Sequence, residues 1–347
     1  MRIVFVTQRV GPGDPALAAT VPKIRALAER VDELTVLALG AAPEGVPGGV
    51  RLRVFGAGTK AGRGLRYAAA LAAELRGRPD ALVAHMSPIY AVLAAPLARP
   101  LGVRIVLWFT HWRATPTLRL AERLAHAVTS VDRRSFPLPS GKLRAIGHGI
   151  DLGEFPCRPE GGGERLRLLA LGRYSEAKGL PYVLRGVRAA LDAGVDAELL
   201  VHGPALTPAE RAHRAELERL AAELRLDGRA RLEGPVPRSS LPELFAAADA
   251  LVNNMRAGAP DKAVYEAAAG CLPVLASNPV FDELFAGLEP PLSFARDQPE
   301  ELAARIAALA ATDPPGRARI GRALRERVEA RHSVGSWADG ILAAAVR

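Results

Sequence analysis

Short apolar segments of strand length alternate with amphipathic helical segments along the chain, and this alternation limits its possible folds most. Strands separated by helices pair in parallel and are covered by helices on both faces of the sheet. The alternation breaks once, at Asp151–Glu164, where two prolines and three consecutive glycines indicate a linker, and then begins again. We therefore predict an α/β fold with two Rossmann-like, doubly wound parallel-sheet domains facing across a cleft.

The length of 347 residues also suits two domains. We place the N-terminal domain at residues 1–152 and the C-terminal domain at 165–330. The segment 331–347 reads as a helix that packs back towards the N-terminal domain. Ligands of doubly wound sheets bind beyond the carboxyl ends of the strands, so the loops at those ends are the candidate sites.

Charge is distributed unevenly between the two halves. The chain has 46 Lys+Arg and 37 Asp+Glu; residues 1–150 hold 21 and 9 of these, which gives +12, and the remainder holds 25 and 28, which gives −3. This asymmetry favours an anionic partner for the first half. A solvated basic face is the alternative interpretation. Nucleic acid is disfavoured because basic and aromatic residues are not interleaved.

The two cysteines, Cys157 and Cys271, lie in no cluster with metal-ligand spacing, and their low number predicts a reducing compartment. The first ten residues lack the regions of a signal peptide and read as a strand. No apolar run reaches the roughly 18–20 residues that a membrane-spanning helix needs. We expect a cytoplasmic protein with no bound metal or cofactor.

A helix, a turn and a buried strand are predicted at Asp261–Asn278. Asp261 is a plausible N-cap, Gly270 a plausible left-handed C-cap, and Leu272–Ala276 an apolar strand. The partial positive charge of the helix N-terminus would lie beside the loop Gly258–Pro260, which makes a suitable seat for a diphosphate.

Two cationic side chains lie near the first predicted strand of the C-terminal domain. Arg173 follows the strand that ends at Gly172, and Lys178 precedes Gly179 and a new helix. A bidentate guanidinium and an ammonium at these positions would form a phosphate clamp. Surface cations without a ligand are the alternative interpretation.

These motifs resemble a known family. LGRYSEAKGLPYVLRGV, VHGPAL, LEGPVPRSSLPELFAAADALV and YEAAAGCLPVLAS look like the donor-binding half of a retaining GT-B glycosyltransferase. The family is the large group that includes sucrose synthase and bacterial lipid mannosyltransferases. GHGID at residues 147–151 resembles the end of that family's first domain.

The resemblance implies an N-terminal acceptor-binding domain and a C-terminal nucleotide-sugar-binding domain. It also implies a metal-independent transfer that retains the anomeric configuration. It assigns catalysis to Arg173, Lys178 and His111, and donor binding to Gly11, Gly13, Gly172, Gly203, Pro235, Val236, Asp261, Lys262, Ala263 and Glu266.

The chain departs from the family at one position. The family has a second Glu eight positions before the one at Glu266, where this chain has Gly258. Asp261 and Lys262 are charged neighbours that could replace it. The departure leaves open which group contacts the hydroxyls of the donor sugar.

Histidines and basic residues are the candidates of the first half. His111 follows an apolar strand and resembles a family histidine near the donor sugar. His85 reads as structural or acceptor-side, and His148 as interdomain. Lys60, Arg63 and Arg66 suggest an anionic acceptor, such as a lipid-linked phosphate sugar, or an anionic membrane surface.

The sequence thus predicts a glycosyltransferase that moves a sugar from a nucleotide diphosphate-sugar to a glycan or lipid-linked acceptor. Two alternatives remain open: a nucleotide-sugar epimerase with a GT-B fold, and a non-catalytic nucleotide-sugar-binding protein. A nicotinamide dehydrogenase is disfavoured because no GxGxxG follows the first strand.

Overall fold

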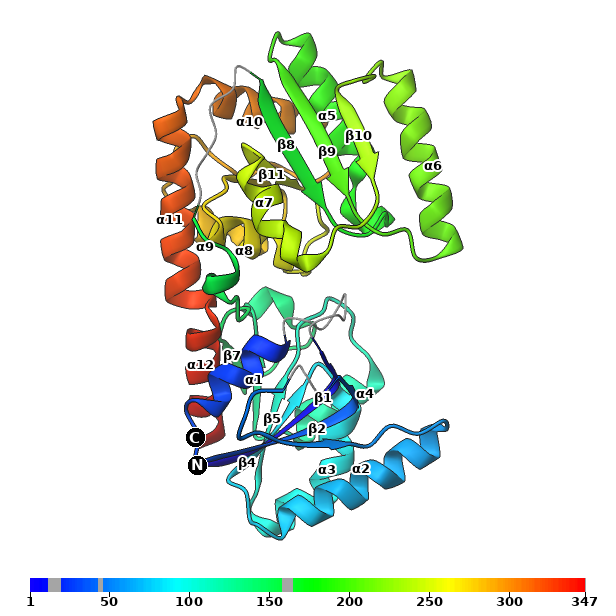
Figure 1. Cartoon of the computed structure of the whole chain (residues 1–347), viewed down its shortest axis with the longest axis vertical. Coiled ribbons are helices and arrows are strands. Elements are labelled where there is room, and N and C mark those ends of the chain that lie inside the picture. The colour runs from blue at the N-terminus through cyan, green and yellow to red at the C-terminus, as the bar shows by residue number, and fades with distance from the viewer. Residues whose placement is uncertain (12–19, 43–45, 158–164, 347) are drawn as a thin grey trace. The chain divides into compact units, whose positions relative to one another are not determined.

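The computed structural model describes residues 1–11, 20–42, 46–157 and 165–346 (Figure 1). They form two compact units, Met1–Asp151 with Arg331–Arg347, and Leu152–Ala330. Each unit contains one parallel sheet, with seven strands in the first unit and five in the second. The prediction of two doubly wound α/β domains is confirmed.

The sheet of the first unit has the order β3-β2-β1-β4-β5-β6-β7. Its strands are β1 (Arg2–Val10), β2 (Glu33–Ala41), β3 (Arg51–Val54), β4 (Ala81–His85), β5 (Arg104–Trp108), β6 (Ala127–Ser130) and β7 (Leu143–Ala145). Its helices are α1 (Thr20–Ala28), α2 (Lys60–Leu75), α3 (Pro88–Ala98), α4 (Pro116–Leu124) and α12 (Val334–Val346).

The two faces of this sheet are covered by different helices. Val4 and Val6 of β1 pack in one core with α2, α3 and α4. Phe5 lies between them in sequence and points to the other face, where its ring lies edge-on to Trp337 of α12. The period of two along β1 therefore explains why both faces need a helical layer.

The sheet of the second unit has the order β10-β9-β8-β11-β12. Its strands are β8 (Leu166–Leu171), β9 (Ala197–His202), β10 (Ala230–Glu233), β11 (Ala250–Asn253) and β12 (Val274–Ala276). Its helices are α5 (Leu180–Asp192), α6 (Pro208–Glu223), α7 (Leu241–Ala246), α8 (Lys262–Ala269), α9 (Asp282–Phe285), α10 (Pro299–Ala311) and α11 (Pro314–His332), whose last two residues belong to the first unit.

The turn after α8 differs from the prediction. Asp261 caps the helix as expected, but Gly270 has a φ of −77° and is not left-handed. Cys271 takes the left-handed conformation instead, with a φ of 63°. A Cβ on Gly321 of α11 would overlap the carbonyl oxygen of Cys271, so α11 packs directly against this turn.

Helix α2 begins earlier than its sequence predicts. We predict its start near Gly64, whereas the structure begins it at Lys60 with Thr59 as the N-cap. The hydroxyl of Thr59 accepts a hydrogen bond from the Gly62 amide at 3.0 Å. The glycines at the start hide the helix from propensity, because glycine is a poor helix former.

Candidate functional site

The candidate donor site lies at the carboxyl edge of the second sheet. The chain proceeds from the central strand β8 to β9 and β10 on one side, and then to β11 and β12 on the other. Such a reversal of strand order leaves a crevice beyond the strand ends, which is the usual ligand site in doubly wound sheets. The loops after β8, β9, β10 and β11, together with helix α8, carry the donor-binding residues predicted in this unit.

Lys178 is held over the end of β8. Its Nζ donates to the carbonyl oxygen of Leu171 at 2.9 Å and forms an ion pair with Asp261. A Cβ on Gly172 would overlap the end of the Lys178 side chain, and Gly172 has a φ of 127°. Glycine at this position therefore makes room for the ammonium group.

Asp261 joins the β8 loop to the start of α8. Its carboxylate accepts from Asn253 Nδ2 at 2.7 Å and from the Ala263 amide at 3.4 Å. Burial alone would raise the pKa of Asp261, but the ion pair with Lys178 and these hydrogen bonds bring it below its usual value. The Asp261 carboxylate thus already accepts a hydrogen bond from the backbone N–H of Ala263, a residue that we predicted to bind the donor.

Arg173 extends from the end of β8 to α6. Its guanidinium pairs with Glu210 at 2.6 Å, while its side chain stays 53% exposed. Glu210 also accepts from the amides of Leu206 and Thr207, at 2.8 and 3.1 Å. Burial would raise the pKa of Glu210, but these amides and Arg173 lower it. The carboxylate thus remains charged and holds Arg173 at the edge of the site.

Glu266 lies buried on α8 and is surrounded by cations. Its Oε1 accepts from Arg238 at 2.6 Å and from Lys262 at 2.9 Å. Arg238 also pairs with Glu154, and its guanidinium lies 5.3 Å from the ring centroid of Phe155. This network fixes the orientation of a carboxylate that we predicted to bind the donor.

The remaining predicted residues of this unit surround the same edge. Gly203 needs to be glycine, because a Cβ there would overlap the carbonyl oxygen of Gly172. Pro235 is exposed and Val236 is half-buried in the loop after β10. Gly258 has a φ of 76°, a conformation that glycine adopts without strain. The charged neighbours expected to replace its missing carboxylate, Asp261 and Lys262, are engaged with other residues.

A cavity of about 500 Å³ opens beside the clamp residues. It is lined by Tyr174, Ser175, Glu176, Ala177, Ala209, Glu210, His213, Arg256 and Arg296. Because Glu210 belongs to this lining, the cavity adjoins the ion pair of Arg173.

Histidine candidates of the first unit have different surroundings. His111 is exposed, and its Nδ1 accepts from the Arg113 amide at 3.0 Å. Partial burial, followed by the nearby charge of Arg113, lowers the pKa of His111. His85 is 2% exposed and stacks on Trp108 with ring centroids 4.9 Å apart. Burial, with the charge of Lys23, holds the pKa of His85 well below its ordinary value.

Two further candidates of the first unit are His148 and Gly11. His148 is buried, with its ring edge-on to Trp108. Gly11 is buried after β1, where a Cβ would lie 3.1 Å from Cβ of Ala42, and Gly13 lies outside the described residues.

In the described part of the chain, no helix has the length and apolar character to cross a membrane.

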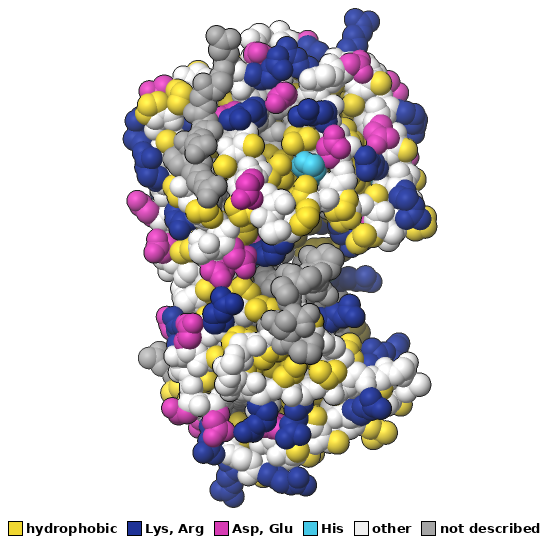
Figure 2. Space-filling model, in the orientation of Figure 1, with side chains coloured by type: hydrophobic (Ala, Val, Ile, Leu, Met, Phe, Trp, Pro, Cys, Tyr) yellow, Lys and Arg dark blue, Asp and Glu magenta, His cyan; other side chains and the backbone are white. Residues whose placement is uncertain are grey.

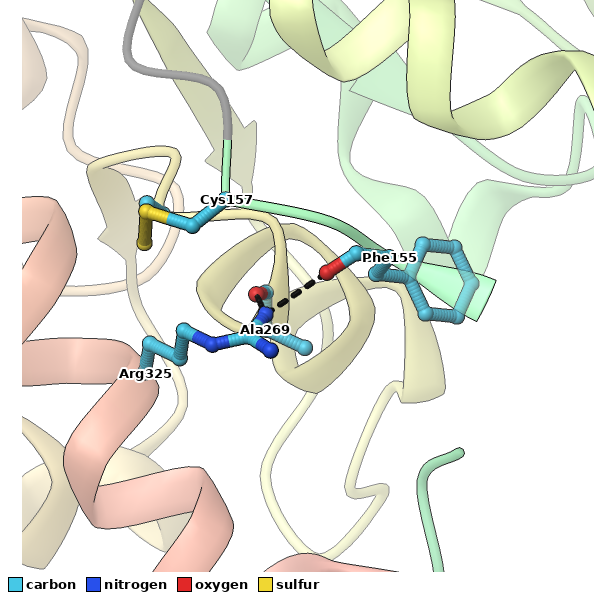
Figure 3. The surroundings of a disulfide bond; sticks show 5 residues. Phe155, Cys157, Ala269 and Arg325 are labelled. Carbon is cyan, nitrogen blue, oxygen red and sulfur yellow. Dashed lines mark hydrogen bonds between the residues drawn. A yellow bond between two sulfur atoms is a disulfide. The ribbon is translucent and has the colours of Figure 1, made fainter. Parts of the chain in front are cut away.

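The two cysteines form a disulfide, which the sequence reading did not predict (Figure 3). Cys157 and Cys271 are separated by 114 residues, and their Cα atoms lie 5.0 Å apart. Beside the disulfide, Arg325 donates to the carbonyl oxygens of Phe155 and Ala269 (Figure 3). The bond is unexpected for a reducing compartment, where cysteines persist as thiols.

Sequence reasoning missed two of the partners that organise the site. Glu210 could have been found, because Thr207 and Glu210 form the spacing of a capping box, which the structure contains. Arg238 has no such local signal. Its role depends on Glu154 and Glu266, which are 84 and 28 residues away in sequence.

The geometry agrees with a comparison against protein families. Residues 165–312 match the family described as glycosyl transferases group 1. These residues are similar to a group 1 glycosyltransferase domain. The match covers the strands and loops that carry Arg173, Lys178 and Glu266, and the predicted family resemblance is confirmed. A comparison with curated proteins found no match.

Solved structures are similar over nearly the whole chain. Sucrose-phosphate synthase from Thermosynechococcus elongatus is 18% identical, with a TM-score of 0.75, covering 99% of this chain and 97% of that one. HepE from Anabaena, in complex with UDP-glucose, is 18% identical, with a TM-score of 0.76 and coverage of 99% and 100%. A glycosyltransferase from Rickettsia africae is 13% identical, with a TM-score of 0.77 and coverage of 99% and 97%. These similarities show the GT-B fold.

Proposed function

We propose that the group 1 glycosyltransferase domain serves a retaining, metal-independent hexosyltransferase. The reaction would move a sugar from a nucleotide diphosphate-sugar to a glycan or lipid-linked acceptor. The observation that carries the proposal is the arrangement of Arg173, Lys178 and Glu266 at the switch point of a domain matched to this family. Two cations and a helix N-terminus are suited to an anion of two phosphates without a metal ion.

A UDP-sugar is the first donor to test. HepE, which has the same fold, was crystallised with UDP-glucose. In this chain, Glu266 is already oriented by Arg238 and Lys262, and a carboxylate so held can accept hydrogen bonds from the two hydroxyls of a ribose. The exposed loop of Pro235 and Val236 would flank the base.

In the proposed mechanism, Arg173 and Lys178 interact most strongly with the diphosphate while the bond between the donor sugar and the diphosphate breaks. The leaving nucleoside diphosphate gains negative charge in the transition state, and cations already in place stabilise that charge. Lys178 is fixed by Leu171 and Asp261, whereas the exposed Arg173 can exchange Glu210 for a phosphate oxygen. The acceptor hydroxyl would then attack from the face that the diphosphate leaves, and a donor phosphate oxygen would take its proton. His111 would contact the donor sugar.

The test combines binding and turnover. A thermal-shift series with UDP, GDP, ADP and UDP-glucose should show stabilisation of about 2.7 kcal/mol when the bound ligand is present at 100 times its Kd. In the variant Arg173→Ala/Lys178→Ala, we expect no measurable transfer and a normal circular dichroism spectrum. Transfer at the wild-type rate in this variant would reject the assignment of the clamp.

Gly258 is the observation that favours a second function, a non-catalytic nucleotide-sugar-binding protein. The family's carboxylate is absent there, and its charged neighbours are held by Lys178 and Glu266. Tight UDP-glucose binding without hydrolysis, epimer formation or transfer to any glycan or lipid acceptor would support this function. Transfer product would exclude it.

We also propose that the protein works in the cytoplasm at the inner face of an anionic membrane. The basic first half supports a partner of negative charge. The disulfide opposes the cytoplasmic part of the proposal. Alkylation of free thiols at the moment of cell lysis tests the cytoplasmic part of the proposal. Two alkylated cysteines would place the protein in a reducing compartment, whereas an intact disulfide would contradict a cytoplasmic location.

A further inference from the structure

Helix α3 presents an apolar stripe to solvent. Ile89, Leu93 and Leu97 are 45%, 37% and 36% exposed, and Leu101 in the following turn is 51% exposed. Residues four apart lie on one side of a helix, so these side chains form a single row. The helix contains no charged residue between Pro88 and Ala98. No charged side chain of α3 itself therefore covers this row.

The neighbouring helices extend this apolar surface. Helix α3 contacts both α2 and α4, and all three share one core against the sheet, so their outer sides adjoin. Leu65 on α2 is 73% exposed and Leu120 on α4 is 45% exposed. Together with the four residues of the α3 row, we call this the α3 surface. Large exposed apolar areas of this kind mark a site of interaction.

Basic residues border the α3 surface. They are Lys60, Arg63 and Arg66 on α2, Arg99 after α3, and Arg119 and Arg123 on α4. Within the described parts of the chain, none of these six forms an ion pair with a carboxylate. Figure 2 shows hydrophobic and basic side chains side by side at lower right, where α2 lies in Figure 1.

Acidic residues of these helices offset little of this charge, because Glu122 is the one carboxylate of the described α2, α3 and α4 that forms no ion pair, against six cations. Glu74 on α2 is buried and pairs with Arg51 and Arg53 of β3. Glu122 on α4 is half-buried and accepts a hydrogen bond from Ser140 at 2.7 Å. The border of the α3 surface is therefore strongly positive.

We infer that the α3 surface docks onto an anionic lipid bilayer, with its apolar row inserted between headgroups and its cations on the phosphates. An apolar row bordered by Lys and Arg is the pattern of interfacial membrane binding. The same charges disfavour a second copy of this chain, because two such borders would repel each other. The inference deepens the membrane part of the proposed function, but vesicle binding needs neither donor nor transfer.

The experiment measures co-sedimentation of the full chain with vesicles of phosphatidylcholine, with or without 30 mol% phosphatidylglycerol. We expect binding only with phosphatidylglycerol and a loss of binding as salt is raised. Each basic residue near a membrane surface contributes a factor of about five. Arg119→Ala/Arg123→Ala should therefore weaken binding about 25-fold, and Leu93→Glu more than tenfold.

The matched control is Leu206→Glu, which places the same substitution on a leucine of the second unit that is 62% exposed. Wild-type vesicle binding by Leu93→Glu, with its circular dichroism unchanged, overturns the inference. So does a dimer in analytical ultracentrifugation that Leu93→Glu converts to monomer. The thermal shift with UDP-glucose is measured for each variant as an independent test of donor binding. A protein that fails to bind the donor would contradict the proposed function, but its binding to vesicles would be unaffected.

Discussion

Loss of the Cys157–Cys271 disulfide should destabilise the second unit selectively. The bond closes a loop of 114 residues, and cross-linking a loop of this length removes about 16 cal/mol/K of entropy from the unfolded chain. At 25 °C this corresponds to about 5 kcal/mol. For a unit of this size, such a loss lowers the melting temperature by about 10–20 °C. The Arg325 contacts join the same segments only in the folded state, so they do not replace the cross-link.

The distribution of tryptophans makes the assay specific. Trp108, Trp112 and Trp337 all lie in the first unit, so tryptophan fluorescence reports unfolding of that unit, while circular dichroism reports both. Wild type with and without reductant is compared with Cys157→Ser and with Cys157→Ser/Cys271→Ser, and free thiols are counted in each sample. We expect the circular dichroism transition to split, with the fluorescence transition unchanged. A single transition at the same temperature in all samples would refute the reasoning.

Two further predictions concern Arg238 and His332. Arg238→Gln should raise the KM for the donor about tenfold, because Glu266 loses a partner that orients it, and should leave the KM for the acceptor unchanged. Initial-rate kinetics measure both constants. The variant Arg238→Lys should restore the KM for the donor in part. Burial, followed by the charge of Arg331, lowers the pKa of His332 to about 4. The unfolded chain then binds the extra proton between about pH 6.5 and 4, so stability falls as the pH drops through this range, by at most about 3 kcal/mol. Urea unfolding at pH 7.5 and 4.5 should show this loss in wild type and a smaller one in His332→Gln.

Local sequence signals predicted the parts of the site that local chemistry determines. The apolar run of β8 ends at Gly172, and the two cations follow within one loop, so Arg173 and Lys178 could be placed at the carboxyl edge. Asp261 before an alanine-rich segment predicted the cap of α8. In each case the residue and the backbone groups that position it lie within a few positions of each other.

The partners of these residues could not be predicted from the sequence, because they are distant along the chain. The ion pair of Lys178 with Asp261 joins residues 83 positions apart, and that of Arg238 with Glu154 joins residues 84 apart. The disulfide joins Cys157 to a Cys271 in the left-handed conformation, whereas the sequence assigned that conformation to Gly270. The turn packs against Gly321 of α11, a residue distant along the chain, and this contact has no local sequence signal.

The two cations of the clamp differ in how easily they can turn to a ligand. Lys178 is 13% exposed and its partner Asp261 is 15% exposed, so separating them would leave two charges with little water. Arg173 is 53% exposed, and Glu210 keeps two backbone amides when Arg173 departs. Exchange of Arg173 from Glu210 to a phosphate therefore costs less than exchange of Lys178 from Asp261. In the proposed mechanism, Arg173 is accordingly the group that would turn to an arriving diphosphate, while Lys178 and the α8 cap would form the fixed wall against which the diphosphate binds.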